Sequence, residues 1–198
     1  MNWNALHWLR HSLVAVAAAA LLAGCDGSTP TGPASSPLTP ASGSGISTKI
    51  VDLGSCDYLR APAGSSVTFH AYARGVQIYR WDGATWTLVG PSATLYADAA
   101  GQAAVGTHYT GPTWRSTSGS TVVGVVGERC TPSADAIPWL SLSAVSTQGS
   151  GVLQGVAYIQ RVNTAGGKAP VEAGTYASEL KGVSYTAEYF FYRSREQA

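Results

Sequence analysis

The sequence is short of charge and has no cluster of basic residues. Only 12% of its 198 residues are Asp, Glu, Lys or Arg, and the formal net charge is +1. The scattered basic residues argue against an electrostatic grip on nucleic acid, which needs grouped Lys and Arg. With 45% hydrophobic residues, the chain is also too apolar for a disordered protein. Its length suits a single domain.

The sequence also lacks the local signatures of common enzymes. It has no Gly-x-Ser-x-Gly elbow, no His-Glu-x-x-His motif, no phosphate-binding loop and no dinucleotide fingerprint. Its Asp and Glu residues are isolated, so no pattern pairs two carboxylates for glycoside hydrolysis. No cofactor is indicated. The sequence therefore favours a protein that is not an enzyme. A catalytic site assembled from distant residues in the fold would, however, leave no local motif.

The first 24 residues are typical of a processing segment. The run from Leu13 to Leu22 is almost purely Ala, Val and Leu, and it is about half as long as the roughly 20 residues that span a bilayer. It ends in Leu22-Ala23-Gly24-Cys25, which resembles the lipobox cleaved by lipoprotein signal peptidase. Acylation of Cys25 would give a stable anchor, because several acyl chains share one residue. We therefore predict a lipoprotein signal peptide at residues 1–24.

The residues after Cys25 indicate where the protein acts. Asp26 resembles the signal that retains lipoproteins in the inner membrane of enteric bacteria. Residues 25–48 are mostly Gly, Ser, Thr, Pro and Ala without an aromatic residue, which predicts a flexible tether. We expect a domain anchored by lipid on the extracytoplasmic side of the cell envelope. Its partners would be the membrane and either a glycan or an envelope protein.

A single all-β domain is predicted at residues 49–193, with a polar tail at 194–198. No window in it has helical apolar spacing, whereas short runs of β-branched and aromatic residues alternate with Gly, Asp and Pro. This pattern predicts an antiparallel β-sandwich or barrel-like domain of about nine short strands. The expected strands are 67–72, 76–81, 85–89, 93–97, 103–109, 121–126, 140–145, 152–161 and 183–192.

Cys56 and Cys130 remain once Cys25 is acylated. Outside the cytosol they could form a disulfide, which would contribute about 4 kcal/mol in the chain-entropy model. With Cys25 acylated, Cys56 and Cys130 can pair only with each other. The sequence does not show whether this bond forms. Neither residue has a His or a second Cys at zinc-ligand spacing, so no metal site is expected.

Five stretches, in order along the domain, carry a family resemblance. They are Gly75–Tyr79, Gly106–Trp114, Ile137–Leu140, Ile159–Pro170 and Tyr185–Tyr192. Together they resemble the domain of unknown function 3455 family of bacteria and fungi. Many members of that family place cysteines after the first and fourth stretches, where this chain has Trp81 and the region of Ala173. The resemblance implies that Cys56 and Cys130 replace that pair, and it implies no activity, because the family has none assigned.

His108 and Trp114 enclose a predicted constrained turn. His108 is one of two histidines, with His70, that follow the predicted cleavage site and titrate near neutral pH. Turns at strand ends often present functional side chains. The competing interpretation is a histidine hydrogen-bonded within the fold that fixes the turn. Trp114, like Trp81, Trp86 and Trp139, could offer a face for stacking a sugar or could belong to the core.

The densest polar group of the domain runs from a strand end into a loop that contains Gly166 and Gly167. Its members are Gln160, Arg161, Asn163 and Lys168. An Arg fork beside an amide could hold a carboxylate, a phosphate or sugar hydroxyls, and paired glycines let the backbone approach a ligand. The same residues could instead brace a long loop, with Arg161 pairing Glu188 or Asp98.

The sequence thus favours a non-enzymatic envelope lipoprotein whose β-domain binds a ligand or partner, with a glycan as one candidate. The binding surface would join the His108–Trp114 turn to the 160–168 loop. One alternative is an extracytoplasmic hydrolase that uses His108 as a base, which requires a cavity with an Asp or Glu in reach of the imidazole. The other is a purely structural envelope protein, which would have neither cavity nor ligand.

Overall fold

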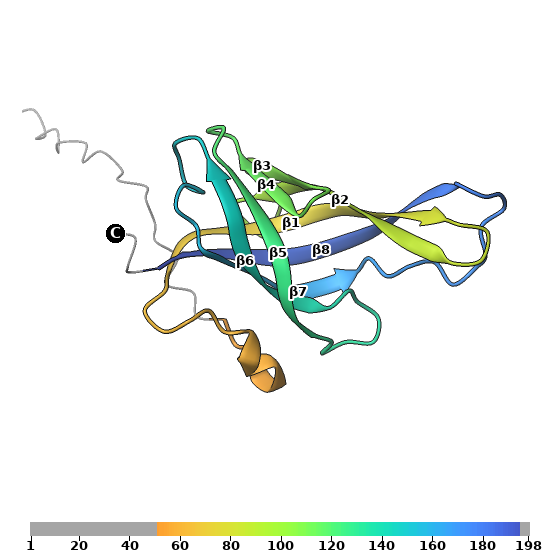
Figure 1. Ribbon diagram of the computed structural model, residues 1–198, viewed down its shortest axis with the longest axis horizontal. Helices are drawn as coiled ribbons and strands as arrows, with labels where there is room; N and C mark the ends of the chain where they lie inside the picture. The colour runs from red at the N-terminus through yellow and green to blue at the C-terminus, as the bar shows by residue number, and fades with distance from the viewer. Residues whose placement is uncertain (1–50, 195–198) are drawn as a thin grey trace, which may run out of the picture. The chain divides into compact units, whose positions relative to one another are not determined.

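The computed structural model describes residues 51–194, so the predicted signal peptide, Cys25, the tether and most of the polar tail lie outside the described residues. Eight antiparallel strands follow one another in sequence order around a closed barrel (Figure 1). The all-β prediction is confirmed. The elements are η1 (Gly54–Leu59), a 3-10 helix, then β1 (Ser66–Trp81), β2 (Trp86–Tyr96), β3 (Ala104–Tyr109), β4 (Thr113–Ser116), β5 (Thr121–Cys130), β6 (Trp139–Gln148), β7 (Tyr158–Gly166) and β8 (Leu180–Arg193).

The strands are fewer, and some are longer, than the sequence predicts. Residues 67–72 and 76–81 join in β1, because Gly75 continues the ladder by pairing with Ala93 on one side and Tyr185 on the other. Residues 85–89 and 93–97 join in β2 in the same way. A short gap in the apolar pattern therefore does not end a strand.

Two segments have a different secondary structure from the one predicted. Residues 113–116, which the prediction leaves outside any strand, form the short strand β4. Residues 152–157, expected at the start of a strand, instead form a turn at 152–155 and then an irregular stretch. Gly151 and Gly155 have φ of 141° and 67° there, in the positive range that glycine adopts without strain.

Three strands continue beyond the rest of the barrel as an arm, made of residues 77–91 and 180–184 (Figure 1). The ladder between β1 and β8 runs out to the pair Arg80 and Leu180. The hairpin between β1 and β2 closes at Asp82-Gly83, where the Asp82 carboxylate accepts a hydrogen bond from the Thr85 backbone N–H at 2.7 Å. An Asp-Gly dipeptide between two strands is typical of a tight hairpin turn.

The main core fills the inside of the barrel. Alternate residues of each strand contribute to it, as the period-two pattern requires. Its largest fully buried side chains include Trp114, Tyr189 and Phe191. Gly124 faces the Trp114 ring, and a Cβ there would lie 3.2 Å from Cζ3 of Trp114, so the missing side chain leaves room for the indole.

A smaller cluster on the outside joins the segment before β1 to the barrel. Leu53, Cys56 and Leu59 pack there against Val162 and Phe190. We call residues 51–60 the strap, because they lie across β7 and β8 and are covalently fastened to β5. None of the helices within residues 51–194 has the length and hydrophobicity needed to cross a bilayer.

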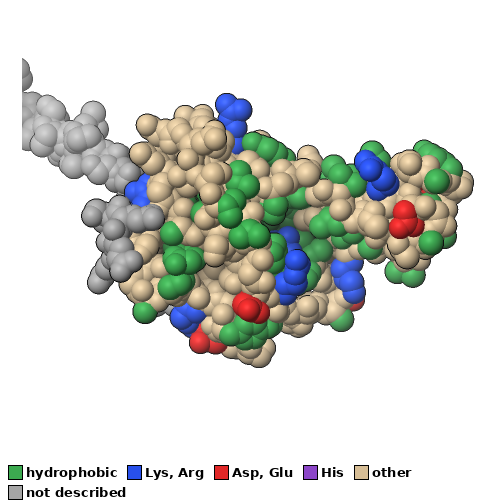
Figure 2. Space-filling view, in the orientation of Figure 1, with side chains coloured by type: hydrophobic (Ala, Val, Ile, Leu, Met, Phe, Trp, Pro, Cys, Tyr) green, Lys and Arg blue, Asp and Glu red, His purple; other side chains and the backbone are tan. Residues whose placement is uncertain are grey.

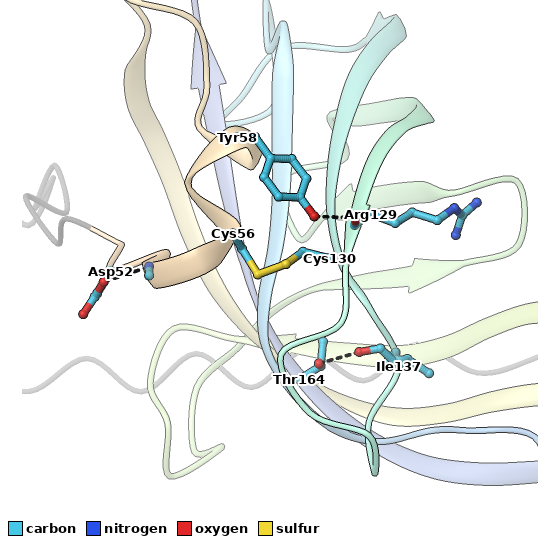
Figure 3. The surroundings of a disulfide bond; sticks show 8 residues. Asp52, Cys56, Tyr58, Arg129, Cys130, Ile137 and Thr164 are labelled. Carbon is cyan, nitrogen blue, oxygen red and sulfur yellow. Dashed lines mark hydrogen bonds between the residues drawn. A yellow bond between two sulfur atoms is a disulfide. The ribbon is translucent and has the colours of Figure 1, made fainter.

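The strap is held by a disulfide and by hydrogen bonds. Cys56 and Cys130 form the disulfide, with their Cα atoms 5.8 Å apart, and the Tyr58 hydroxyl donates to the Arg129 carbonyl at 2.9 Å (Figure 3). On its other side, the Leu59 carbonyl accepts a hydrogen bond from Nε2 of Gln160 at 2.6 Å.

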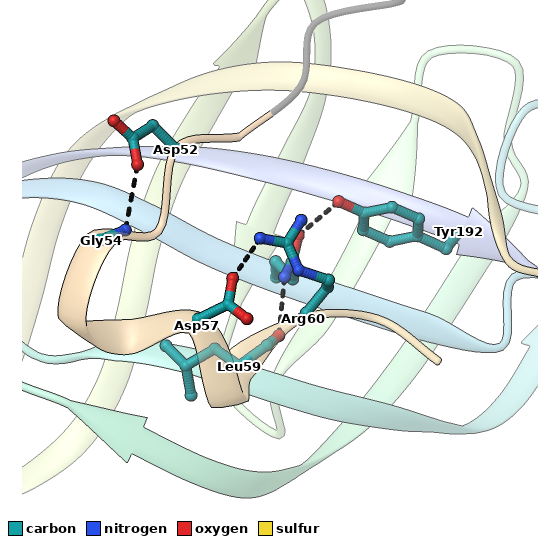
Figure 4. Close-up of polar contacts among 7 residues, drawn as sticks. Asp52, Gly54, Asp57, Leu59, Arg60 and Tyr192 are labelled. Atoms are coloured by element: carbon teal, nitrogen blue, oxygen red, sulfur yellow. Dashed lines mark hydrogen bonds and ion pairs between the residues drawn. The ribbon is translucent and has the colours of Figure 1, made fainter. Parts of the chain in front are cut away.

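The polar ends of the strap are also paired (Figure 4). Asp52 accepts a hydrogen bond from the Gly54 N–H at 3.0 Å, and Arg60 pairs with Asp57. The Tyr192 hydroxyl donates to Gln160, so the amide that holds the strap is itself held by β8.

Candidate ligand-binding site

A cavity of about 140 Å³ lies where the arm joins the barrel. A dry apolar cavity of about 150 Å³ can hold a benzene molecule, so this one is large enough for a compact small molecule. The lining combines an apolar wall with a set of polar side chains. The apolar residues are Leu88, Pro91, Pro112, Val126, Leu140 and Leu142, and the polar or aromatic ones are Gln77, His108, Trp114, Arg129, Arg161 and Tyr189.

The cavity runs from a deep interior end to a mouth at the surface. At the deep end, Gln77, Trp114 and Tyr189 are each 1% exposed. At the other end, Leu88 is 58% exposed and Arg129 is exposed as well. A ligand would therefore enter past Leu88 and Arg129 and come to rest against the aromatic side chains inside.

The hairpin of β3 and β4 positions His108 against Trp114. The two residues are direct partners in the ladder, and their rings stack with centroids 4.4 Å apart and planes 4° from parallel. Nδ1 of His108 donates to the Thr113 carbonyl at 2.9 Å, which leaves the lone pair on Nε2. Burial lowers the pKa of His108 to about 3, so the ring is neutral. His108 both fixes the turn and lines the cavity.

Three polar groups on the cavity wall have no hydrogen-bond partner within the described part of the chain. They are Nε2 of Gln77, Nε1 of Trp114 and the hydroxyl of Tyr189. The Tyr189 hydroxyl lies near Tyr185 and Arg161 without a hydrogen bond of normal geometry to either. Each such group costs about 1–3 kcal/mol when it is buried unpaired, and native proteins have few of them.

Arg161 is the charged side chain of the interior. It lies opposite Tyr189 in the ladder between β7 and β8. Its Nε and Nη2 both donate to the Pro138 carbonyl, at 3.1 and 2.9 Å. Its charge opposes protonation of His108 and favours ionisation of Tyr189, but burial has the larger effect and raises the pKa of that tyrosine.

Arg161 does not form either of the ion pairs that the sequence suggests. Glu188 instead pairs with Nε2 of His70 at 2.9 Å, and Asp98 accepts hydrogen bonds from the backbone N–H groups of Gln102 and Ala103. No Asp or Glu lines the cavity. Between residues 51 and 194, no carboxylate forms an ion pair with Arg161 or Arg129.

The structure brings together three of the six predicted ligand-binding residues. His108, Trp114 and Arg161 share the cavity, although they come from β3, β4 and β7. The polar group at 160–168 is otherwise divided, because Gln160, Asn163 and Lys168 do not line this cavity. Their partners are, in order, the Leu59 carbonyl at 2.6 Å, Oε1 of Glu188 at 3.1 Å and the Ala134 carbonyl at 2.6 Å. These contacts brace the fold.

Sequence reasoning missed Gln77, Tyr189 and Arg129. A signal for Gln77 is present, because it continues the inward register of Ala71, Ala73 and Gly75 and is therefore a polar residue in an apolar alternation. Its position is fixed by Gly167, where a Cβ would lie 3.2 Å from Cγ of Gln77. Tyr189 and Arg129 have no comparable local signal, because only the closed barrel brings their strands to the cavity.

The other tryptophans lie away from this cavity. Trp81 and Trp86 pack against each other on the arm with centroids 5.4 Å apart, and Trp139 packs against the strap cluster. None of the three is fully buried, and Trp114 alone of the four lines the cavity. In the part of the chain that the structure describes, no group of three or more His, Cys, Asp or Glu side chains is arranged to hold a metal ion.

Fold and site together define an all-β barrel with an internal cavity, three of whose polar groups have no hydrogen-bond partner among residues 51–194. The chain belongs to the DUF3455 family, whose description is protein of unknown function and whose profile matches residues 62–193. The five stretches that carry the resemblance all lie within this range, so the family assignment made from the sequence is confirmed. No curated protein and no solved structure matches the chain.

The structure also bears on the cysteines that the family resemblance implies at Trp81 and near Ala173. The Trp81 carbonyl accepts a hydrogen bond from the Ser178 N–H at 2.8 Å, and a Cβ at Gly174 would overlap the Trp81 side chain. The two regions are therefore neighbours on the arm. In this chain, tryptophan packing occupies the place where such a pair would lie.

Proposed function

We propose that this domain binds a small molecule in the cavity at the base of the arm. The unpartnered polar groups of Gln77, Trp114 and Tyr189 carry this proposal. A fold that needed them only for packing would be more stable with apolar residues in their place, because buried donors without acceptors are costly. A ligand that supplies the missing hydrogen bonds removes this cost when it binds.

The cavity favours binding over catalysis. A hydrolase that used His108 as a base would place a carboxylate and a nucleophile beside it. The rings around His108 are instead those of Trp114 and Tyr189, with centroids 4.4 and 5.1 Å away. A pKa near 3 also makes this imidazole a weak base. The apolar wall favours a ligand with a compact apolar body over a hydroxyl-rich glycan.

We also infer that the protein acts outside the cytosol, attached to a membrane through an acylated Cys25. The lipobox-like sequence supports the anchor, and the disulfide between Cys56 and Cys130 fits an oxidising compartment. Fractionation of cells that produce the wild type or a Cys25→Ser variant tests the anchor. Loss of the variant from the membrane fraction is expected, and an unchanged distribution would contradict the inference.

The binding site is tested with compact apolar probes and a pair of neighbouring substitutions. Benzene, phenol and indole are added to the purified full-length chain, and the melting temperature is measured for each. Val126→Phe fills the cavity, because Val126 lines it. Val125→Phe is the matched control, because Val125 is the preceding residue on β5 and is 52% exposed outside the cavity.

At least one probe is expected to raise the melting temperature of the wild type and of Val125→Phe but not of Val126→Phe. A tenfold excess of a probe over its Kd should stabilise by about 1.4 kcal/mol, which is readily measured. Equal shifts in both variants would mean that the probe binds elsewhere. No shift with any probe would favour a structural role for the domain.

A further inference from the structure

We propose that the ligand is a small organic acid with a compact apolar body, and that Arg161 holds its carboxylate. This inference rests on the proposed function and names the chemical class that the cavity selects. It is carried by an imbalance between hydrogen-bond donors and acceptors in the cavity, by an uncompensated positive charge, and by the shape and polarity of the wall.

The unmatched polar groups of the cavity are mainly donors. Gln77 Nε2 and Trp114 Nε1 can only donate, and the Tyr189 hydroxyl can donate as well. An Arg guanidinium has five N–H donors, of which those on Nε and Nη2 of Arg161 serve the Pro138 carbonyl. The acceptors on the same wall are Nε2 of His108 and the side-chain oxygen of Gln77, so donors outnumber acceptors. The complementary ligand is therefore rich in acceptors and poor in donors, as a carboxylate is.

The positive charge of the cavity also lacks a counterion. Arg161 is half-buried and Arg129 stands at the mouth, yet neither forms an ion pair with a carboxylate of residues 51–194. Burying a charge is costly unless it is paired. A carboxylate can meet a guanidinium through two parallel hydrogen bonds, which are about twice as strong as neutral ones.

The distribution of charged side chains on the surface argues against a polyanion as the ligand. On the face shown in Figure 2, Lys, Arg, Asp and Glu side chains are scattered among hydrophobic and uncharged ones and form no broad basic area. A nucleic acid or an acidic polymer needs such an area. The positive charge of the site is confined to two side chains on the wall of a cavity of about 140 Å³, which suits a small monoanion.

The apolar part of the wall accommodates the body of the acid. Trp114 and His108 present stacked rings there, and Leu140 and Leu142 form the wall beside them. Burial of apolar area against these groups contributes about 25 cal/mol per Å². A body the size of a benzene ring matches the volume. The acid would thus bind with its ring against these groups and its carboxylate toward Arg161 and the neighbouring Tyr189 hydroxyl.

Two ligands of similar size separate this inference from the proposed function itself. Benzoate carries the carboxylate, and benzyl alcohol carries a neutral hydroxymethyl group on the same ring. Their Kd values are measured by titration calorimetry with the purified full-length chain. Acetate tests the carboxylate without the ring, and phenyl phosphate tests a different oxyanion on the same ring.

The variants are Arg161→Gln, Arg161→Lys and Arg115→Gln. Arg115 is the matched control, because it is exposed on β4 beside Trp114 and does not line the cavity. Arg161→Lys keeps the charge but loses the fork, so it should recover part of the affinity. Circular dichroism establishes that each variant is folded before the titrations are compared.

Benzoate is expected to bind the wild type and Arg115→Gln at least tenfold more tightly than benzyl alcohol does, and acetate should bind far more weakly. Arg161→Gln should abolish the preference for benzoate, because it should weaken the binding of benzoate at least tenfold and that of benzyl alcohol much less. If Arg161→Gln fails to fold, two measurements decide the question. They are the preference of the wild type for benzoate over benzyl alcohol, and the smaller preference expected of Arg161→Lys.

The outcomes that overturn the inference are distinct from those that overturn the proposed function. Benzyl alcohol binding as tightly as benzoate would end the case for an acid and leave a ligand-binding cavity. Tighter binding of phenyl phosphate would replace the carboxylate by a phosphate. If none of these compounds binds and the apolar probes also fail, the site does not bind small molecules and both proposals fall.

Discussion

At the scale of single residues, two buried glutamines show the difference between the inside and the outside of the barrel. Gln160, 2% exposed, lies on the outer side, where its amide links the Leu59 carbonyl to the Tyr192 hydroxyl. Gln77, 1% exposed, lies on the inner side, where its Nε2 has no partner among residues 51–194. The first stabilises the fold, whereas the second is available to a ligand.

This difference predicts opposite effects of the same substitution. Gln77→Met should raise the free energy of unfolding of the ligand-free protein by about 1 kcal/mol, because it removes an unpaired buried donor. Gln160→Met should lower it by about 1–3 kcal/mol, because it leaves the Leu59 carbonyl without its donor. Urea denaturation measures both. Destabilisation of equal size in the two variants would contradict the role assigned to Gln77.

His108 makes the stability of the protein depend on pH. Its pKa is lowered from 6.5 to about 3 by burial, so the unfolded chain takes up a proton below pH 6.5 while the folded chain does not. Folding stability is therefore lost as the pH falls from about 6.5 toward 3, by up to about 1.4 kcal/mol per pH unit. Above pH 6.5 this residue contributes no pH dependence.

The comparison is with His108→Asn, whose amide can still donate to the Thr113 carbonyl. Urea denaturation at several pH values should show that the advantage of the wild type over the variant shrinks as the solution is acidified. The comparison cancels the contributions of other groups that titrate in this range. Parallel curves for the two proteins would refute the assignment of this pH dependence to His108.

At the scale of elements, the strap is the part of the domain that depends most on a covalent bond. It contains Cys56 and lies before residue 62, where the match to the family begins. Its disulfide to Cys130 spans a sequence separation of 74 residues. Because a bond across a long loop mainly restricts the unfolded chain, we expect it to stabilise the whole domain rather than the strap alone.

Replacing both cysteines by serine should lower the free energy of unfolding by about 4 kcal/mol. Tyr58→Phe is the control, because it removes only the hydrogen bond to the Arg129 carbonyl and should cost about 1 kcal/mol. Guanidinium denaturation of the three proteins gives the comparison. A loss below about 1 kcal/mol in the double variant would mean that the packing of Leu53 and Leu59 holds the strap without the bond.

The elements also show what sequence patterns could and could not predict. Alternation and turn residues located most strands and the hairpin at Asp82-Gly83, because these depend on neighbours in sequence. Strand β4 escaped prediction because four residues are too few for an alternation to be recognised. The 160–168 group was divided because alternate residues of β7 face opposite sides of the sheet, which directs Arg161 inward and Gln160 outward.

At the scale of the whole molecule, closure of the barrel creates the site. The cavity takes residues from strands that are far apart in sequence, from Gln77 on β1 to Tyr189 on β8. Pairing of β1 with β8 along most of their length brings these residues to one interior. The cavity, and the donors of Gln77 and Trp114 that have no partner among residues 51–194, exist only because the barrel closes. Composition and spacing could therefore indicate His108, Trp114 and Arg161 and place their segments on one binding surface, but not that these side chains line an internal cavity together with Gln77 and Tyr189.

The same closure fixes where attachments to the domain can be made. Ser66 pairs with Arg193, so the described chain enters and leaves the barrel at one end, and the arm extends from the opposite end (Figure 1). An attachment made where the chain enters β1 or where it leaves β8 would thus present the arm, with the cavity at its base, away from a biosensor support. Either of these two attachment points should serve equally well for screening ligands.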